Sequence, residues 1–218
     1  MDKPFGKLIH SDIFTFHIGP EKAPFAVHSV AIARQSPALD ALVNSNMTEA
    51  RSRTVTWPDV DVDTFIRFCE FCYLNDYSPP SCQQANGERS EEIPGADRWS
   101  EPSDAPPKSH PDKYGIEPLK DLVLYKLYRT LKNFTIFPTR IRDIIELIRF
   151  TYHDENTRGR VDGIDGLRKL VTHFVVYWLD CITWHDDFLE ILYEGGEFVT
   201  DFWKLVRKEA VFPLREQE

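Results

Sequence analysis

Residues 11–77 constrain the fold most strongly, because strands and helices are predicted to follow one another there with almost no linker. Apolar and polar residues alternate over residues 13–18, which is typical of a half-buried strand. Two further short strands are expected over residues 23–28 and 53–57, the first of them preceded by a Gly-Pro turn. Short strands interleaved with helices in so few residues predict a small α+β unit.

Three helices are predicted within the same segment. Two short ones are expected over residues 29–34 and 37–43, and Ser36 can cap the second, which begins with a proline. A longer helix is expected after Asp61 or Asp63, either of which can cap it. Its apolar residues are spaced to form one face, namely Val62, Phe65, Ile66, Cys69, Cys72 and Tyr73.

The chain is predicted to be helical after residue 118. Residues 119–131 carry apolar side chains on a wide arc, so we expect this helix to be buried on more than one side. Pro138 is expected to open the next helix, and Gly195-Gly196 to end a short helix over residues 188–192. The residues predicted to face inward are Ile141, Ile144, Ile145, Ile148, Tyr152, Leu167, Leu170, Val171, Phe174, Val175, Trp178, Leu179, Phe198, Val199, Phe202, Leu205 and Val206.

Residues 78–111 differ in composition from everything around them. They hold 7 of the 15 prolines and few large apolar residues, so their burial cannot offset the entropy of ordering the chain. We therefore predict a long disordered insertion. Trp99 lies in an acidic tract within it, and a short linear binding motif is the alternative interpretation.

The charge of the chain argues against several classes of partner. The net charge is −9 and none of the three parts, residues 1–77, 78–111 and 112–218, is basic, so we expect no direct binding of nucleic acid and no attraction to an anionic membrane. The N-terminus lacks the apolar core of a signal peptide. The four cysteines are unevenly spaced, which is typical of reduced thiols. Together these features predict an intracellular protein of the cytoplasm or nucleus.

Candidate chemical sites are weak in this sequence. Cys69 and Cys72 form a C-x-x-C pair, but two further zinc ligands at matched spacing are missing, so core packing is the preferred interpretation. His185, Asp186 and Asp187 lie where a helix is expected to begin, and there acidic residues favour the helix dipole. We therefore predict no catalytic residue, no metal site and no cofactor.

The segment of residues 11–77 resembles the BTB/POZ domain. The resemblance rests on ordered matches along the whole segment, and it resumes after the insertion. The matching stretches are Ser11-Asp12, Phe25-Ala26-Val27-His28, Ala31, Arg34, Ser36-Pro37, Met47-Thr48-Glu49-Ala50, Trp57-Pro58-Asp59-Val60-Asp61, Phe65, Phe68 to Tyr73, Asp112-Lys113-Tyr114-Gly115-Ile116 and Leu119-Lys120.

This resemblance implies a fold and a division into domains. It implies an α+β BTB/POZ domain over residues 11–132, with a short three-stranded sheet covered by helices and the insertion inside it. Residues 133–210 are expected to form an all-α C-terminal domain. Through Leu131-Lys132-Asn133-Phe134, Arg168-Lys169-Leu170-Val171 and Glu194-Gly195-Gly196-Glu197-Phe198, that part is similar to the helical tail of a fungal-type group of BTB proteins.

The resemblance also implies candidate protein-binding residues. In BTB adaptors of cullin-based ubiquitin ligases, a hydrophobic residue, any residue and a glutamate follow the second helix, and Met47-Thr48-Glu49 matches this pattern. The alternative is that Met47 packs locally and that Glu49 is a solvated charge. Asp12 and His28 are further candidates for protein binding. Dimeric BTB transcription factors pair this aspartate with a basic residue just after the histidine, but Ser29 stands at that position, so their charged pocket is expected to be missing here.

Three functions follow as hypotheses. The first is a non-enzymatic protein-interaction module that acts as a homo-oligomerising scaffold, with a homodimer formed through residues 29–44, or as a substrate adaptor that binds a cullin scaffold. Only about ten residues precede Ser11, so the N-terminal exchange seen in BTB dimers is not expected. The alternatives are a transcriptional co-regulator that acts through protein contacts and an enzyme of unrecognised class.

Overall fold

The computed structural model describes residues 4–79, 114–134, 136–137, 140–153 and 165–210, and for residues 209–210 the backbone alone. The chain divides into two compact units, one formed by residues 1–82 with 111–122 and the other by residues 83–110 with 123–218. The predicted insertion lies, apart from residues 78 and 79, outside the described residues. The predicted boundary between residues 132 and 133 stays a prediction.

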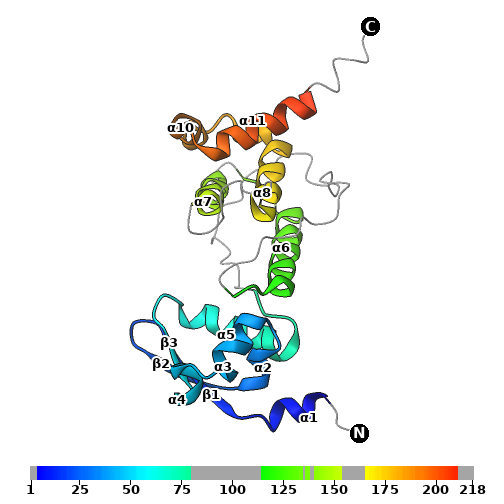
Figure 1. Cartoon of the computed structure of the whole chain (residues 1–218). Helices are drawn as coiled ribbons and strands as arrows, with labels where there is room; N and C mark the ends of the chain where they lie inside the picture. The colour runs from blue at the N-terminus through cyan, green and yellow to red at the C-terminus, as the bar shows by residue number, and fades with distance from the viewer. Residues whose placement is uncertain (1–3, 80–113, 135, 138–139, 154–164, 211–218) are drawn as a thin grey trace. The chain divides into compact units, whose positions relative to one another are not determined.

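The first unit contains a three-stranded mixed sheet (Figure 1). Its strands are β1 (Ile13–Ile18), β2 (Ala23–His28) and β3 (Thr54–Trp57), in the order β2-β1-β3. β1 pairs with β2 antiparallel and with β3 parallel. This arrangement confirms the predicted α+β class, and all three strands lie within a residue of where the sequence places them.

Aromatic side chains fill the core of this unit. Phe14, Phe16 and Ile18 are buried on one face of β1, as their alternation predicts. The ring of Phe16 packs edge-on against Trp57 of β3 with 4.9 Å between ring centres, and lies 5.1 Å from the ring of Phe65. The core thus joins the central strand to the helix that follows the third strand.

Five helices belong to the first unit before the insertion: α1 (Pro4–Ile9), α2 (Ser29–Ala33), α3 (Pro37–Asn44), α4 (Thr48–Ser52) and α5 (Val62–Leu74). Ser36 caps α3 by accepting the Leu39 N–H, and Asp61 caps α5 by accepting the Thr64 N–H. The sequence predicted α2, α3 and α5 but neither α1 nor α4. α1 contributes Leu8, which is fully buried.

The predicted inward face of α5 is wrong in part. Val62 and Ile66 are exposed, whereas Phe71, which was not assigned to that face, is buried together with Phe65 and Cys72. The apolar residues of α5 cover more than one side of the helix, so spacing alone does not select the side that packs on the sheet.

Helices make up the described part of the second unit: most of α6 (Glu117–Lys132), then α7 (Ile141–Tyr152), α8 (Gly166–Tyr177), α9 (Leu179–Ile182), α10 (Asp186–Glu194) and α11 (Glu197–Ala210). The predicted inward residues of α7, α8 and α11 lie in its core or pack against it. On α6, Val123 and Tyr125 are exposed, so the predicted burial of a wide arc is wrong for these two residues. Pro138 lies outside the described residues.

Candidate protein-interaction surface

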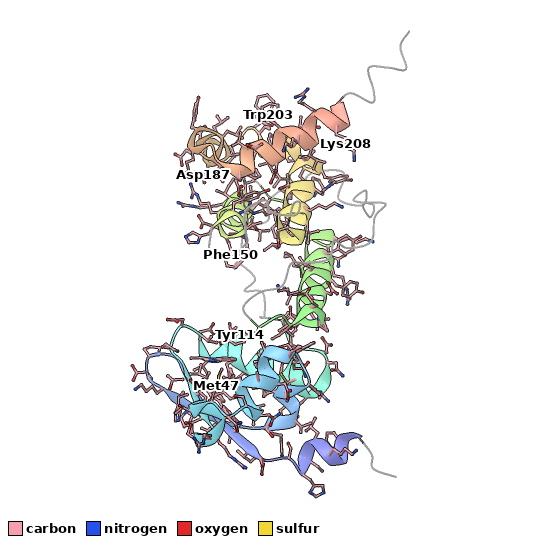
Figure 2. The ribbon with its side chains drawn as sticks, in the orientation of Figure 1. Met47, Tyr114, Phe150, Asp187, Trp203 and Lys208 are labelled. Carbon is pink, nitrogen blue, oxygen red and sulfur yellow. The ribbon has the colours of Figure 1, made fainter. Side chains whose placement is uncertain are left out.

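Met47 and Glu49 are both exposed on the first unit, in residues 44–53, here called the α3–α4 segment. Met47 precedes α4 and is 62% exposed, which is high for a large apolar side chain (Figure 2). Glu49 is exposed in the first turn of α4, where a carboxylate favours the positive end of the helix dipole. The segment therefore presents an apolar side chain and a negative charge together to solvent.

Local hydrogen bonds hold this segment in place. The Met47 N–H donates to Ser45 Oγ at 3.2 Å, and the Arg51 N–H donates to the Met47 carbonyl at 3.0 Å. Arg53 ends α4 in the left-handed conformation, with φ of 55°, and its carbonyl accepts the Thr15 N–H of β1 at 2.9 Å. The segment is thus fixed at its C-terminal end to the central strand of the sheet.

Asp12 makes an ion pair with Arg53. The distance between Arg53 Nη2 and Asp12 Oδ2 is 2.9 Å, and both side chains are more than half exposed. The Asp12 carbonyl also accepts the N–H of Ser29, which is buried. The end of α4 therefore supplies the basic partner of Asp12. The family resemblance had placed that partner at position 29.

A small hollow opens beside this ion pair. It is lined by residues of β1, α2 and the α3–α4 segment, among them Asp12, Ser29, Asn44 and Arg53. Its volume of about 190 Å³ is below the roughly 300 Å³ at which small-molecule pockets begin. This hollow is therefore too small to enclose a drug-sized ligand.

His28 lies in a partly buried position, where it contacts the end of α5. Its Nδ1 lies 2.8 Å from Tyr73 Oη, and its backbone N–H donates to the same oxygen at 3.0 Å. The two rings meet edge-on with 5.9 Å between their centres. Because Tyr73 Oη accepts the backbone N–H, its own proton can be donated to Nδ1. These contacts support a role for His28 in joining β2 to α5.

Cys69 and Cys72 pack in the core of the first unit. Cys72 is fully buried, and burial raises the pKa of its thiol, with a smaller contribution from Cys69. Burial also raises the pKa of Cys69, to about 11. Both groups are therefore protonated thiols near neutral pH, which disfavours nucleophilic or metal-binding chemistry.

The other candidate chemical residues lie at the start of α10. His185 Nδ1 is 3.7 Å from Asp187, and Asp186 and Asp187 occupy the first turn. Within the described ranges, no group of three or more His, Cys, Asp and Glu residues is arranged to hold a metal ion. No helix of those ranges is long and apolar enough to cross a membrane.

Two contacts of the candidate residues were not predicted from the sequence, the one between Asp12 and Arg53 and the one between His28 and Tyr73. Arg53 stands directly before β3, and the parallel pairing of β3 with β1 brings it near Asp12. The register of that pairing is the signal that could have found it. Tyr73 was assigned to the buried face of α5, but no sequence pattern predicted that its hydroxyl contacts His28.

Comparison with known proteins identifies the first unit. Residues 7–87 match the family model of the BTB/POZ domain. This match covers the sheet, helices α2 to α5 and the α3–α4 segment, and it confirms the resemblance found in the sequence. A comparison with curated proteins finds no significant match.

Proposed function

Because this chain carries a BTB/POZ domain, we propose that it is an adaptor whose α3–α4 segment binds a cullin scaffold. BTB/POZ domains are protein-interaction modules and are generally not enzymes. The adaptor function is more specific than this general property of the domain. The observation that supports it is that Met47 and Glu49 are both exposed in the α3–α4 segment. We place this function inside the cell, in the cytoplasm or nucleus.

The α3–α4 segment has the properties of a small interface centre. Protein interfaces combine a desolvated apolar anchor with charged or polar groups at the rim. Met47 supplies an unbranched, adaptable apolar side chain, and Glu49 supplies the charge two residues further on. The hydrogen bonds that Ser45 Oγ and the Arg53 carbonyl accept fix the segment before binding, which lowers the entropy cost of association.

Binding to the N-terminal domain of a cullin tests the proposal. Immobilised cullin domain would be titrated with the full chain and with the variants Met47→Ala and Glu49→Ala. We expect binding by the wild type and a loss of about tenfold or more for each variant, since hot-spot residues cost more than about 1.4 kcal/mol when truncated. Absence of binding by the wild type at tens of micromolar would overturn the cullin assignment.

Matched controls are available on the same unit. Leu74 is 70% exposed at the end of α5, so Leu74→Ala removes a similarly exposed apolar side chain outside the segment. Glu21 is an exposed glutamate in the turn between β1 and β2, so Glu21→Ala removes an equivalent charge. Both should bind like the wild type, and an equal loss from these variants would contradict a specific role for Met47 and Glu49.

The homo-oligomerising scaffold remains a second proposal for the same domain. BTB/POZ domains mediate dimerisation, and α2 carries Val30 as a partly exposed apolar residue. Val30→Lys is expected to weaken self-association if the dimer forms through residues 29–44. Sedimentation of a strictly monomeric wild type at tens of micromolar would contradict this dimer.

A further inference from the structure

The outward face of α10 combines apolar and acidic side chains. Asp186, Leu189, Glu190 and Tyr193 are separated by three, four and seven positions and therefore share one side of the helix. All four are exposed, Tyr193 at 88%, while Phe188 and Ile191 are buried. Asp186, Leu189, Glu190 and Tyr193 are here called the acidic face of α10.

A fully exposed tryptophan lies next to this face. Trp184 is 88% exposed and stands two residues before α10 begins. Tryptophan and tyrosine are enriched at protein interfaces. Trp184, Leu189 and Tyr193 are therefore exposed apolar side chains that can contact a partner.

The outward face of α11 has the opposite charge. Trp203, Lys204, Arg207 and Lys208 are all exposed, Trp203 at 52% (Figure 2). The opposite side of the helix carries Phe198 and the other inward residues. These four exposed residues are here called the basic face of α11.

The charges of the two faces are unused within the part of the chain that the structure describes. There, Asp186 and Glu190 form no ion pair, and neither do Lys204, Arg207 and Lys208. By contrast, Glu194 at the end of α10 pairs with Arg149 of α7 at 3.0 Å. Asp186 and Glu190 therefore differ from Glu194, whose charge is paired within the unit.

Among the described residues, no ion pair joins the two faces. α10 and α11 pack through their buried sides, with the rings of Phe188 and Phe202 5.7 Å apart between centres. Their exposed faces are turned away from that contact. A second molecule is needed to bring an acidic face against a basic face.

We propose that the occupant is a second copy of this chain, with the acidic face of α10 in one copy docked on the basic face of α11 in the other. The contact joins two different faces, so it gives a closed dimer when a two-fold axis makes it twice and an open chain of copies otherwise. The aromatic residues Trp184, Tyr193 and Trp203 supply the apolar contact, and opposite charges fix its register. A nucleic acid or an anionic membrane would leave the acidic face repelled, whereas a second copy satisfies both.

Charge reversal on each face tests the proposal. Variant A carries Asp186→Lys and Glu190→Lys, and variant B carries Lys204→Glu and Arg207→Glu. Each variant brings like charges together in its own dimer, so we expect self-association of the full chain to weaken about a hundredfold for each. An equimolar mixture of A and B restores opposite charges at both contacts and is expected to associate like the wild type in sedimentation velocity.

Three measurements complete the test. Raising the salt from low to high ionic strength should weaken association of the wild type, because exposed charges are screened. Asp59→Lys with Asp63→Lys reverses two exposed acids of the first unit and should not change association. Tyr193→Ala with Trp203→Ala removes the apolar contact without reversing charge, and should also give a monomer with unchanged helical circular dichroism.

Each contrary result overturns the proposal. A monomeric wild type at tens of micromolar in low salt removes its basis. A dimer that variants A and B leave intact assigns self-association to another surface, such as residues 29–44. A mixture of A and B that fails to associate, when each is folded by circular dichroism, shows that the two faces do not meet. Cullin binding by the α3–α4 segment is measured separately and does not depend on these outcomes.

Discussion

The guanidinium carbon of Arg168 lies 4.8 Å from the centre of the Tyr152 ring, inside the helical unit. Arg168 is 1% exposed and makes an ion pair with Glu197 of α11. The Tyr152 hydroxyl in turn lies 2.7 Å from Thr172 Oγ1 and donates to Asp201 Oδ2 at 3.3 Å. One polar cluster therefore joins α7, α8 and α11 within an otherwise apolar core.

Removal of Arg168 should destabilise this unit. Arg168→Ala loses the buried stem, the contact with the Tyr152 ring and the ion pair, and we expect the free energy of unfolding to fall by about 3 kcal/mol. Arg168→Met keeps most of the volume, and Glu197 is exposed enough to be hydrated, so its loss should be smaller. Urea unfolding measures both, with Lys208→Ala as an exposed control that should stay within about 0.5 kcal/mol. Equal stability of Arg168→Ala and the control would contradict the assignment.

The hydroxyl of Tyr73 should be worth a measurable amount of stability. Tyr73→Phe keeps the ring contact with His28 and removes the oxygen that accepts the His28 N–H. We expect a loss of about 1–2 kcal/mol, the usual cost of a partly buried donor left without its partner. Chemical unfolding gives this value, and Tyr193→Phe, which alters a tyrosine of α10 that is 88% exposed, is the control. A loss no larger than that of the control would show that the bond contributes nothing.

The ion pair of Asp12 and Arg53 should contribute little to stability. Both side chains are more than half exposed, so solvent screens the attraction between them. A double-mutant cycle with Asp12→Asn and Arg53→Gln is expected to give a coupling energy below about 1 kcal/mol that decreases as salt is added. A larger coupling, unchanged by salt, would show that the pair is a structural element of the fold.

The thiol of Cys69 should make stability depend on alkaline pH. Burial raises the pKa of Cys69 from 9.0 to about 11, so the folded protein holds its proton when the unfolded chain has lost it. The contribution is fully present below pH 9 and is lost as the pH rises from 9 towards 11. We therefore expect Cys69→Ala to show a weaker decline in unfolding free energy over this range than the wild type. Identical pH profiles would contradict a raised pKa.

Alkylation gives a second measurement on the same thiol. At pH 8 the folded protein should react with iodoacetamide about a hundredfold more slowly at Cys69 than the urea-unfolded chain, because the thiolate is the reacting form. Mass spectrometry of the modified peptide follows the rate. Equal rates in the folded and unfolded protein would show an accessible, ionised Cys69.

The sequence predicted the strands and most helices well because local patterns decide them. Alternation of apolar residues defines β1, and the side chains of Ser36 and Asp61 mark where α3 and α5 begin. The short helices α1 and α4 were missed. α4 has no buried residue, so its sequence carries no apolar face that could identify it. α4 mattered most, because it carries Glu49.

The inward face of α5 shows where local patterns end. Its apolar residues surround much of the helix, and only the packing of Phe65 on Phe16 and Trp57 decides which of them are buried. The sequence could not predict the partners of Asp12 and His28 for a related reason. Arg53 and Tyr73 lie 41 and 45 residues away along the chain, and no local pattern carries such pairings.

The sequence by itself determined that this chain is an α+β protein with a BTB/POZ domain and that helices follow it, because periodicity, capping residues and ordered motifs are local. The tertiary structure decided which charges meet. It paired Asp12 with Arg53 and enclosed Arg168 with Tyr152 and Glu197, while it left the opposite charges of α10 and α11 on the surface. Pairing of distant charges depends on how strands and helices pack, and packing is a property of the folded chain as a whole.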